Sequence, residues 1–376
     1  MKILITGGHL TPAIALIEEL QQRNLSTNSY QIVFVGRKFA LEGEDTVSEE
    51  YKSIIARKIP FYSLTTGKLT RHFTKFTFIS IVKIPLGLWQ SFKIIQKEKP
   101  DIIMSFGGYI ALPIALVAFP FRIPIITHEQ TLTPGLANKI IAFFASKVCL
   151  SWPVNKKLSS KIIYTGNPVR KSIFVKDKPS FIKDLPDGKI LYITGGNLGS
   201  HIINEVIAKS IRELLKEFVI IHQCGNSQIY QDFGTLSFIK EKLPPDLINK
   251  YYLLPYIPDN QVGWVMQKAD LVIGRAGANT VTELLVLGKV SLLIPLPWAG
   301  GNEQEKNAQM LENLGTAEII SQSNFSPESL LATVSKIMNN LGKYQKKTLP
   351  NYQSIHLIAA KKIADVINDV YQKKSS

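Results

Sequence analysis

The sequence predicts two α/β domains, each built on a doubly wound parallel sheet. Short apolar segments alternate with amphipathic helical segments, and this alternation occurs twice along the chain. The strand segments are continuously apolar, which is typical of parallel strands that helices cover on both faces. The chain has 376 residues, whereas a single domain usually holds roughly 100–200. Apolar residues make up 45% of it and charged residues 19%, which indicates a globular protein.

The expected strands fall into two series, which a charged, proline-rich segment at 168–187 separates as the predicted linker. The first series is 2–6, 31–35, 101–106, 124–127, 148–151 and 162–165, and the second is 189–194, 218–223, 252–254, 271–273, 291–294 and 317–320. Helices are expected at 12–22, 88–97, 202–217, 279–287 and 355–370, with Thr11 as the N-cap of the first helix and Pro12 in its first turn. We therefore predict an N-terminal domain over 1–167 and a C-terminal domain over 168–351, with the helix in 352–376 packing back on the first.

The formal net charge of +15 indicates an anionic partner: nucleic acid, a phosphorylated ligand or an anionic membrane surface. No known nucleic-acid-binding motif is present, so no nucleic-acid partner is expected.

The two cysteines, Cys149 and Cys224, each end an apolar run, which predicts buried thiols and a reducing compartment. The apolar stretch 109–127 contains three prolines and is a poor membrane span. Cysteine and histidine spacing predicts no metal site, and the N-terminus shows no signal peptide. A cytoplasmic protein is expected, with a position on a membrane surface left open.

Glycine turns follow strands in both halves of the chain and open the next helix. The four turns are Thr6-Gly7-Gly8-His9, Phe106-Gly107-Gly108-Tyr109, Thr194-Gly195-Gly196-Asn197 and Arg275-Ala276-Gly277-Ala278. A helix N-terminus offers free N–H groups to an anion, often a phosphate, and glycine lets that ligand approach the backbone. The alternative is that glycine merely suits a strand-to-helix turn, but four such turns favour a ligand-binding role. Neither the G-x-G-x-x-G dehydrogenase fingerprint nor a P-loop is present.

Several motifs together resemble the MurG family of N-acetylglucosaminyltransferases, within glycosyltransferase family 28. They run through nearly the whole chain: Gly7-Gly8-His9-x-x-Pro12, Gly107-Gly108-Tyr109-x-x-x-Pro113, His128-Glu129-Gln130, Pro134-Gly135-x-x-Asn138, Thr165-Gly166-Asn167-Pro168-Val169-Arg170, His222-Gln223-x-Gly225, Arg275-x-Gly277-Ala278-x-Thr280-Val281-x-Glu283 and Asn302-x-Gln304-x-x-Asn307-Ala308. The resemblance implies a GT-B fold, in which two Rossmann-like domains face each other across a cleft. It also implies inverting transfer of N-acetylglucosamine (GlcNAc) from UDP-GlcNAc to the C4 hydroxyl of N-acetylmuramic acid (MurNAc) in undecaprenyl-pyrophosphoryl-MurNAc-pentapeptide (lipid I), with no cofactor.

The resemblance places the donor in the C-terminal domain, with the stretch 274–308 as its main part. Glu283 would accept hydrogen bonds from the ribose hydroxyls, or be an ordinary glutamate that the helix dipole favours. Arg275 would face the UDP or the acceptor, or form a surface salt bridge. Gln304 and Asn302, expected just before a helix, would bind the GlcNAc hydroxyls. The remaining predicted donor residues are Gly195, Gly196 and Asn197 at the diphosphate, Tyr256 and Ile257 at the uracil, and Gly277.

The acceptor and the catalytic base belong to the N-terminal domain by the same resemblance. His9 is the first candidate base, because an unperturbed histidine pKa of about 6.5 suits proton transfer at neutral pH. The alternative is that His9 caps a helix or binds the acceptor pyrophosphate, and Glu129 is the second candidate base. The predicted acceptor residues are Gly7, Gly8, Gly107, Gly108, Tyr109, Asn138, Asn167 and Arg170. Three departures from the family pattern are a shortened first glycine turn, Thr131 in place of Asn, and Asn197-Leu198 in place of Ser-Gln.

Two segments mix cations with aromatic and aliphatic side chains: Lys68–Trp89 and Phe119–Arg122. Such a mixture suits an anionic membrane surface, and the alternative is a buried helix whose lysines extend to water. The resemblance favours membrane docking, and hence a peripheral protein at the cytoplasmic face of the plasma membrane. Two other functions stay open at this point. One is a UDP-GlcNAc 2-epimerase, which also uses paired Rossmann-like domains, and the other is a sugar-nucleotide-binding subunit without activity.

Overall fold

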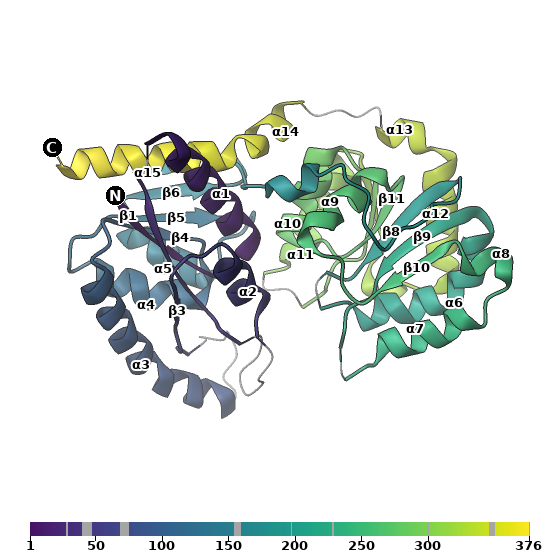
Figure 1. Cartoon of the computed structure of the whole chain (residues 1–376), viewed down its shortest axis with the longest axis horizontal. Helices are drawn as coiled ribbons and strands as arrows, with labels where there is room; N and C mark the ends of the chain where they lie inside the picture. Colours follow the sequence, from purple (N-terminus) through teal and green to yellow (C-terminus); the bar gives the residue numbers. More distant parts are fainter. Residues whose placement is uncertain are drawn as a thin grey trace. The chain divides into compact units, whose positions relative to one another are not determined.

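The computed structural model describes residues 1–27, 29–39, 47–67, 75–153, 159–196, 198–227, 229–298, 301–345 and 350–375. The chain forms two compact units (Figure 1). One comprises Met1–Arg170 together with Ile355–Ser376, and the other is Lys171–Ser354. Each unit contains its own parallel sheet, so the predicted pair of doubly wound domains is confirmed.

The sheet of the first unit has seven strands in the order β3-β2-β1-β4-β5-β6-β7. The strands are β1 (Lys2–Thr6), β2 (Gln31–Gly36), β3 (Phe61–Ser63), β4 (Ile102–Ser105), β5 (Ile125–Glu129), β6 (Lys147–Leu150) and β7 (Ile162–Tyr164). The helices of this part of the chain are α1 (Leu10–Thr27), α2 (Glu49–Ala56), α3 (Lys75–Glu98), α4 (Gly108–Ala118), α5 (Leu136–Phe144), α14 (Pro350–Leu357) and α15 (Ala359–Ser375). Two hydrophobic clusters, one on each face of the sheet, form the core.

The sheet of the second unit has six strands in the order β10-β9-β8-β11-β12-β13. They are β8 (Lys189–Thr194), β9 (Phe218–Gln223), β10 (Tyr251–Leu254), β11 (Leu271–Gly274), β12 (Ser291–Leu293) and β13 (Ala317–Ile319). The helices are α6 (His201–Glu217), α7 (Asp232–Glu241), α8 (Pro245–Ile248), α9 (Asp259–Lys268), α10 (Ala278–Leu287), α11 (Glu303–Asn313), α12 (Pro327–Asn339) and α13 (Leu341–Gln345), with short 3-10 turns η1 (Lys171–Phe174) and η2 (Gln322–Asn324).

Several elements differ from the sequence prediction; helix α3, for example, begins at Lys75 where a helix was expected only over 88–97. Strand β3 was not predicted, because its sequence Phe61-Tyr62-Ser63 contains only two apolar residues and shows no continuous apolar run. The expected N-cap Thr11 is wrong: α1 begins at Leu10, so Thr11 lies inside the helix. The predicted linker contains η1, which packs so closely on α9 that a Cβ at Gly263 would lie 2.1 Å from the Ser172 carbonyl oxygen. That part of the linker is therefore packed structure.

The last helix returns to the first unit, where α15 packs on α1 (Figure 1). Its buried face includes Ile363 and Ile367, which join the same hydrophobic cluster as Leu16. An ion pair of 2.8 Å between Arg23 and Asp365 flanks this contact. The apolar stripe of the helix requires a partner surface, and α1 supplies it.

Three buried histidines predict that acid destabilises both units. Burial lowers the pKa of His128 to about 4, of His356 to about 4 and of His222 to about 3. Because these values lie below the usual 6.5, the unfolded chain binds more protons than the folded chain between pH 6.5 and about 4. Above pH 6.5 these histidines therefore do not reduce the free energy of unfolding. As the pH falls through that window, the free energy of unfolding decreases by up to about 1.4 kcal/mol per pH unit for each histidine.

Urea unfolding followed by tryptophan fluorescence, at several pH values across the window, measures this loss. Variants that retain a single tryptophan separate the two units: Trp152 reports on the first, since its ring lies 4.6 Å from the His356 ring, and Trp264 reports on the second. The matched variant is His356→Asn, which cannot titrate but can still accept the hydrogen bond that Asn167 N–H donates to His356 Nδ1. In this variant we expect the free energy of unfolding of the first unit to depend less steeply on pH than in the wild type. An unchanged slope would contradict the assignment of part of the acid sensitivity to His356.

Candidate functional site

Two glycine turns of the first unit meet at the carboxyl edge of its sheet. Strands β1 and β4 are neighbours, and the strand order reverses direction between them, which is where ligands bind in doubly wound folds. The turn after β1 holds Gly7 and Gly8, and the turn after β4 ends at Gly107, the N-cap of α4, with Gly108 as the first residue of that helix. A Cβ on Gly8 would lie 2.2 Å from the carbonyl oxygen of Gly107, so the two backbones pack directly together. The structure therefore places these four predicted acceptor residues side by side.

His9 lies beside the His128-Glu129-Gln130 segment, although 121 positions separate it from Gln130. The two side chains are linked by a hydrogen bond of 2.8 Å between Gln130 Nε2 and His9 Nδ1. Burial lowers the pKa of His9 below its usual 6.5, while the Glu129 carboxylate acts in the opposite direction. His9 is therefore neutral at pH 7. Gln130 is buried, and the structure shows no hydrogen-bond partner for its side-chain amide oxygen Oε1.

Glu129 is buried and accepts hydrogen bonds at both carboxylate oxygens. Its Oε1 accepts from Thr131 N–H at 2.9 Å and Thr131 Oγ1–H at 2.7 Å. Its Oε2 accepts from Asn138 Nδ2–H at 2.8 Å and from Gly135 N–H at 3.3 Å. Thr131 thus adds both backbone and hydroxyl hydrogen bonds to this carboxylate. The predicted acceptor residue Asn138 is itself buried, and it holds Glu129 in place.

Sequence reasoning missed Glu50, a carboxylate beneath the first glycine turn. Its Oε2 accepts from Arg37 N–H at 2.7 Å, and the Gly8 N–H also donates to it. A Cβ on Gly7 would lie 2.0 Å from Glu50 Oε1. Burial raises the pKa of Glu50, and these hydrogen bonds oppose the shift. The turn therefore already binds the carboxyl side chain of a residue of α2. The sequence signal was weak, since Glu49 and Glu50 look like ordinary acidic residues in the first turn of a helix.

The other predicted acceptor residues lie at different points of the first unit. Tyr109 is in the first turn of α4, and the Arg37 guanidinium stands over its ring at 5.9 Å. Asn167 is buried, and its backbone N–H donates to His356 Nδ1 at 2.8 Å. Arg170 is the last residue of the unit before the chain enters the second one.

In the second unit, the strand order reverses direction between β8 and β11. The turn after β8 carries Gly195 and Gly196, whereas Asn197 lies outside the described residues. Gln223, which sequence reasoning had not selected, connects two predicted donor segments. Its Nε2 donates to the Gly196 carbonyl at 3.0 Å, and its Oε1 accepts from Ile257 N–H at 3.0 Å. The motif His222-Gln223 was the available signal.

Arg275 follows β11 and is held by groups of its own unit. It donates to Ser200 Oγ at 2.8 Å, to Gln322 Oε1 at 2.7 Å and to the Ile294 carbonyl at 2.9 Å. Burial lowers its pKa to about 10. The guanidinium follows β11 and thus hydrogen-bonds Ser200, the residue immediately before α6, which follows the neighbouring strand β8.

The remaining predicted donor residues surround α10 and α11. Gly277 is the N-cap of α10, and Glu283 lies further along that helix with 5% of its surface exposed. Asn302 is the N-cap of α11, with a left-handed backbone (φ 55°). Gln304 lies inside α11, so its expected position before the helix is wrong, and its Oε1 accepts from Leu296 N–H at 3.1 Å. Tyr256 and Ile257 follow β10.

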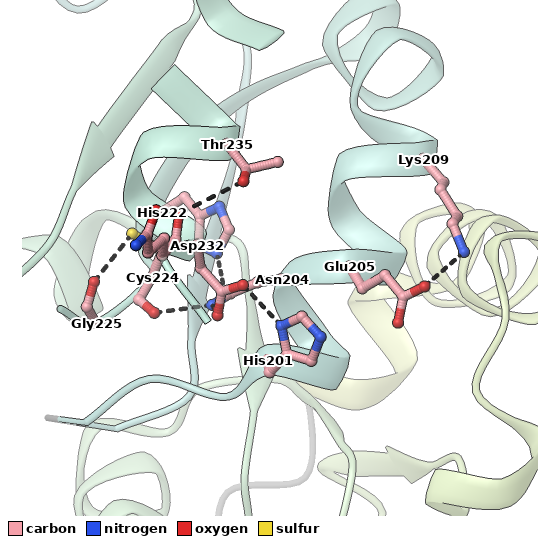
Figure 2. Close-up of polar contacts among 10 residues, drawn as sticks. His201, Asn204, Glu205, Lys209, His222, Cys224, Gly225, Asp232 and Thr235 are labelled. Carbon is pink, nitrogen blue, oxygen red and sulfur yellow. Dashed lines mark hydrogen bonds and ion pairs between the residues drawn. The ribbon is translucent and has the colours of Figure 1, made fainter. Parts of the chain in front are cut away.

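A polar network, buried at Asn204, His222 and Asp232, fixes the start of α6 against β9 (Figure 2). Asp232 accepts from His201 Nδ1 at 2.7 Å and from Asn204 Nδ2 at 2.8 Å, and Asn204 Oδ1 lies 3.1 Å from His222 Nε2. The His201 ring stacks on Tyr230 with centroids 4.2 Å apart. The sequence did not indicate His201 or Asp232. The network holds the helix whose N-terminus faces the Gly195–Gly196 turn.

Exposed aromatic side chains gather on α3 and at the end of α4. Trp89 is 54% exposed, Phe119 52% and Phe121 47%, and the ammonium of Lys93 lies 3.7 Å from the Trp89 ring. Part of the predicted segment Lys68–Trp89, residues 68–74, lies outside the described residues.

Over the described part of the chain, no helix has the length and hydropathy needed to span a membrane. The same part holds no cluster of three or more His, Cys, Asp or Glu arranged as metal ligands.

Comparison with known proteins identifies the family. The model of the glycosyltransferase family 28 N-terminal domain matches residues 6–150, and that of the family's C-terminal domain matches residues 190–369. A Clostridium perfringens protein named UDP-N-acetylglucosamine–N-acetylmuramyl-(pentapeptide) pyrophosphoryl-undecaprenol N-acetylglucosamine transferase is 36% identical over 354 residues, which cover 91% of this chain and 92% of the relative.

Solved structures agree with this result. The crystal structure of Acinetobacter baumannii MurG matches with a TM-score of 0.68 and 26% identity, over 98% of this chain and 100% of that one. A putative UDP-N-acetylglucosamine 2-epimerase from Listeria monocytogenes has a TM-score of 0.69 over 99% of this chain and 97% of its own, but at 14% identity it shares the fold alone. The predicted GT-B class and the predicted UDP-GlcNAc-dependent glycosyltransferase are both confirmed. The chain belongs to glycosyltransferase family 28.

Proposed function

We propose that this chain transfers GlcNAc from UDP-GlcNAc to the C4 hydroxyl of MurNAc in lipid I, which forms lipid II for peptidoglycan synthesis. The observation that carries the proposal is the 36% identity, over 91% of the chain, to a transferase named for this reaction. In the reaction the C4 oxygen bonds to the anomeric carbon of GlcNAc as the bond to the UDP oxygen breaks, with inversion. The hydroxyl proton goes to a base, and UDP leaves as an anion.

His9 is the base in this proposal. It is buried, neutral at pH 7 and held by Gln130, whereas both oxygens of Glu129 already accept hydrogen bonds. A neutral histidine can accept a proton at Nε2 only when Nδ1 carries the hydrogen. Gln130 selects between these tautomers, because its amide can present either Nε2–H or Oε1 to His9 Nδ1. We assign the Oε1 orientation to the catalytic state, since it frees His9 Nε2. Gln130 is then a positioning residue.

The acceptor is assigned to the unit Met1–Arg170 with the C-terminal helix, and the donor to the unit Lys171–Ser354. The N-terminus of α4, beside Gly107 and Gly108, suits the acceptor pyrophosphate. At the donor, the N-terminus of α6 suits the diphosphate and would stabilise the negative charge of departing UDP. Glu283 binds the ribose hydroxyls, and Gln304 binds GlcNAc. In both units, the reversal of strand order at the carboxyl edge supports these assignments.

The direct test is incubation of the purified protein with UDP-GlcNAc and a lipid I analogue, followed by mass spectrometry of the products. We expect the disaccharide-linked analogue together with an equal amount of UDP. Formation of UDP-ManNAc in place of that product would instead establish an epimerase. Binding of UDP-GlcNAc without any product would establish a binding subunit, and either result would overturn the proposal.

Membrane docking is part of the same proposal, since a lipid-linked acceptor stays in the bilayer. The exposed Trp89, Phe119 and Phe121 and the nearby cations Lys93 and Arg122 suit the interface of an anionic leaflet. We therefore assign the protein to the cytoplasmic face of the plasma membrane, as a peripheral protein.

The double variant Trp89→Ala with Phe119→Ala is expected to weaken binding to vesicles about tenfold or more, because two large apolar side chains no longer insert. Co-sedimentation with phosphatidylglycerol vesicles measures the effect, and phosphatidylcholine vesicles separate the apolar contribution from the charge contribution. The KM for UDP-GlcNAc, measured with a soluble acceptor analogue, is the control for folding. Unchanged sedimentation of a folded variant would exclude these side chains from the docking surface.

A further inference from the structure

An apolar cavity of about 190 Å³ lies in the first unit, among α3, α4 and α5. The face of α4 that lines it carries Tyr109, Leu112 and Leu116, which are spaced three and four residues apart and therefore share one stripe of the helix. This stripe starts in the first turn, next to Gly107 and Gly108, and Leu116 lies about 10 Å farther along the axis from Tyr109. The cavity thus begins where the proposed pyrophosphate site ends.

The other two helices present matching stripes. Helix α3 contributes Ile84 and Leu88, and α5 contributes Ala137 and Ile140, each pair three or four residues apart. At the rim, Leu136 is 46% exposed. Pockets that bind small molecules are lined mainly by apolar side chains, which bury the apolar part of the ligand. Three apolar stripes around an unfilled space therefore form a site for an apolar ligand.

We propose that this cavity binds the first isoprene units of the polyprenyl chain on the acceptor. The inference rests on the proposed function and deepens it, because it assigns a site to the lipid part of that substrate. An apolar cavity of about 150 Å³ can bind benzene, so the space here accommodates on the order of one or two isoprene units. The prenyl chain is bonded directly to the pyrophosphate, and α4 joins the two sites: its N-terminus faces the anion and its stripe faces the cavity. This continuity favours the acceptor's own chain over a bilayer acyl chain.

Two soluble acceptor analogues test the proposal. Both carry MurNAc-pentapeptide on a pyrophosphate. One bears a short prenyl tail, and the other bears an oligoethylene glycol tail of equal length. The wild-type protein is expected to show the lower KM with the prenyl analogue. Ala137→Phe and Leu112→Trp fill the cavity and are expected to raise the KM for that analogue about tenfold or more, because burial of the tail is lost. The KM for the glycol analogue and the KM for UDP-GlcNAc should change by less than about twofold.

The matched control is Gln96→Phe, which adds an aromatic ring at an exposed position of α3 that does not line the cavity. It should leave the KM for both analogues unchanged.

One result would overturn the cavity proposal and leave the proposed function standing: both analogues are converted with equal KM, and neither filling variant changes that KM. Failure of the wild-type protein to convert either analogue would instead overturn the proposed function, and the cavity proposal with it. Weaker binding of the filling variants to acceptor-free vesicles, with unchanged KM values, would assign the cavity to a bilayer lipid and overturn the proposal.

Discussion

His9→Ala is expected to lower kcat by about 10²- to 10⁴-fold, because the attacking hydroxyl loses the group that takes its proton. The KM for UDP-GlcNAc should stay near the wild-type value, since the proposed donor residues all lie in the unit Lys171–Ser354. Steady-state kinetics with a soluble acceptor analogue measure both quantities. Near-normal turnover in a variant that still binds the donor would exclude His9 as the base.

The pH profile tests the same assignment without removing the histidine. A base must be unprotonated, so kcat is expected to rise with pH and to level off above the pKa of His9. Burial places that pKa below 6.5, and the falling limb therefore lies on the acid side of pH 6.5. The protein also loses stability below pH 6.5, because its buried histidines become protonated on unfolding. Rates must therefore be measured at pH values where tryptophan fluorescence shows that the protein is still folded.

Variants of Gln130 distinguish positioning from simple packing. In Gln130→Glu, a carboxylate accepts the His9 Nδ1 hydrogen and stabilises the cation, so we expect activity to persist with the acid limb shifted to higher pH. In Gln130→Leu, nothing selects the tautomer, so kcat should fall while the KM for the donor is retained. A role in packing alone would change stability in these variants and leave the position of the acid limb unmoved.

Gly8→Ala is expected to destabilise the first unit by about 3 kcal/mol, since it combines a strained backbone with a steric clash. Gly8 has φ +149°, a value that side-chain-bearing residues rarely adopt. Its added Cβ would lie 2.2 Å from the carbonyl oxygen and 2.7 Å from the carbonyl carbon of Gly107, both backbone atoms with little freedom to move. The two turns would have to separate, and acceptor turnover should fall with the stability.

Urea unfolding of a variant that retains Trp152 as its single tryptophan checks the stability of that unit, and turnover with the soluble analogue checks the site. The control is Gly135→Ala, in the same region, where a Cβ would meet no atom within 4 Å and φ is −65°. That change should cost less than about 1 kcal/mol, because only a glycine N-cap is lost. Equal effects of the two substitutions would show that the close approach of the two turns is unimportant.

Much of the fold could be predicted from local patterns. Continuous apolar strands, glycine turns and amphipathic helices are properties of neighbouring residues, so the two sheets and the five helices named from the sequence follow from it, whereas the remaining helices were not predicted. Strand β3 was missed because its two apolar residues, Phe61 and Tyr62, do not form a continuous apolar run. Gln304 was placed outside its helix because helix ends depend on capping geometry, which composition defines loosely.

The sequence by itself determined the two doubly wound domains and the family motifs, including His9, Glu129 and Glu283. Only the tertiary structure decided which of these groups touch one another. The carboxyl ends of β1 and β5 meet at one edge of a parallel sheet, which brings Gln130 within 2.8 Å of His9 across 121 positions. The same long-range packing places Glu50 under the first glycine turn and leaves a cavity among α3, α4 and α5. Strand and helix periodicity assigns each residue to a face, but the partner of that face depends on strand order and helix packing.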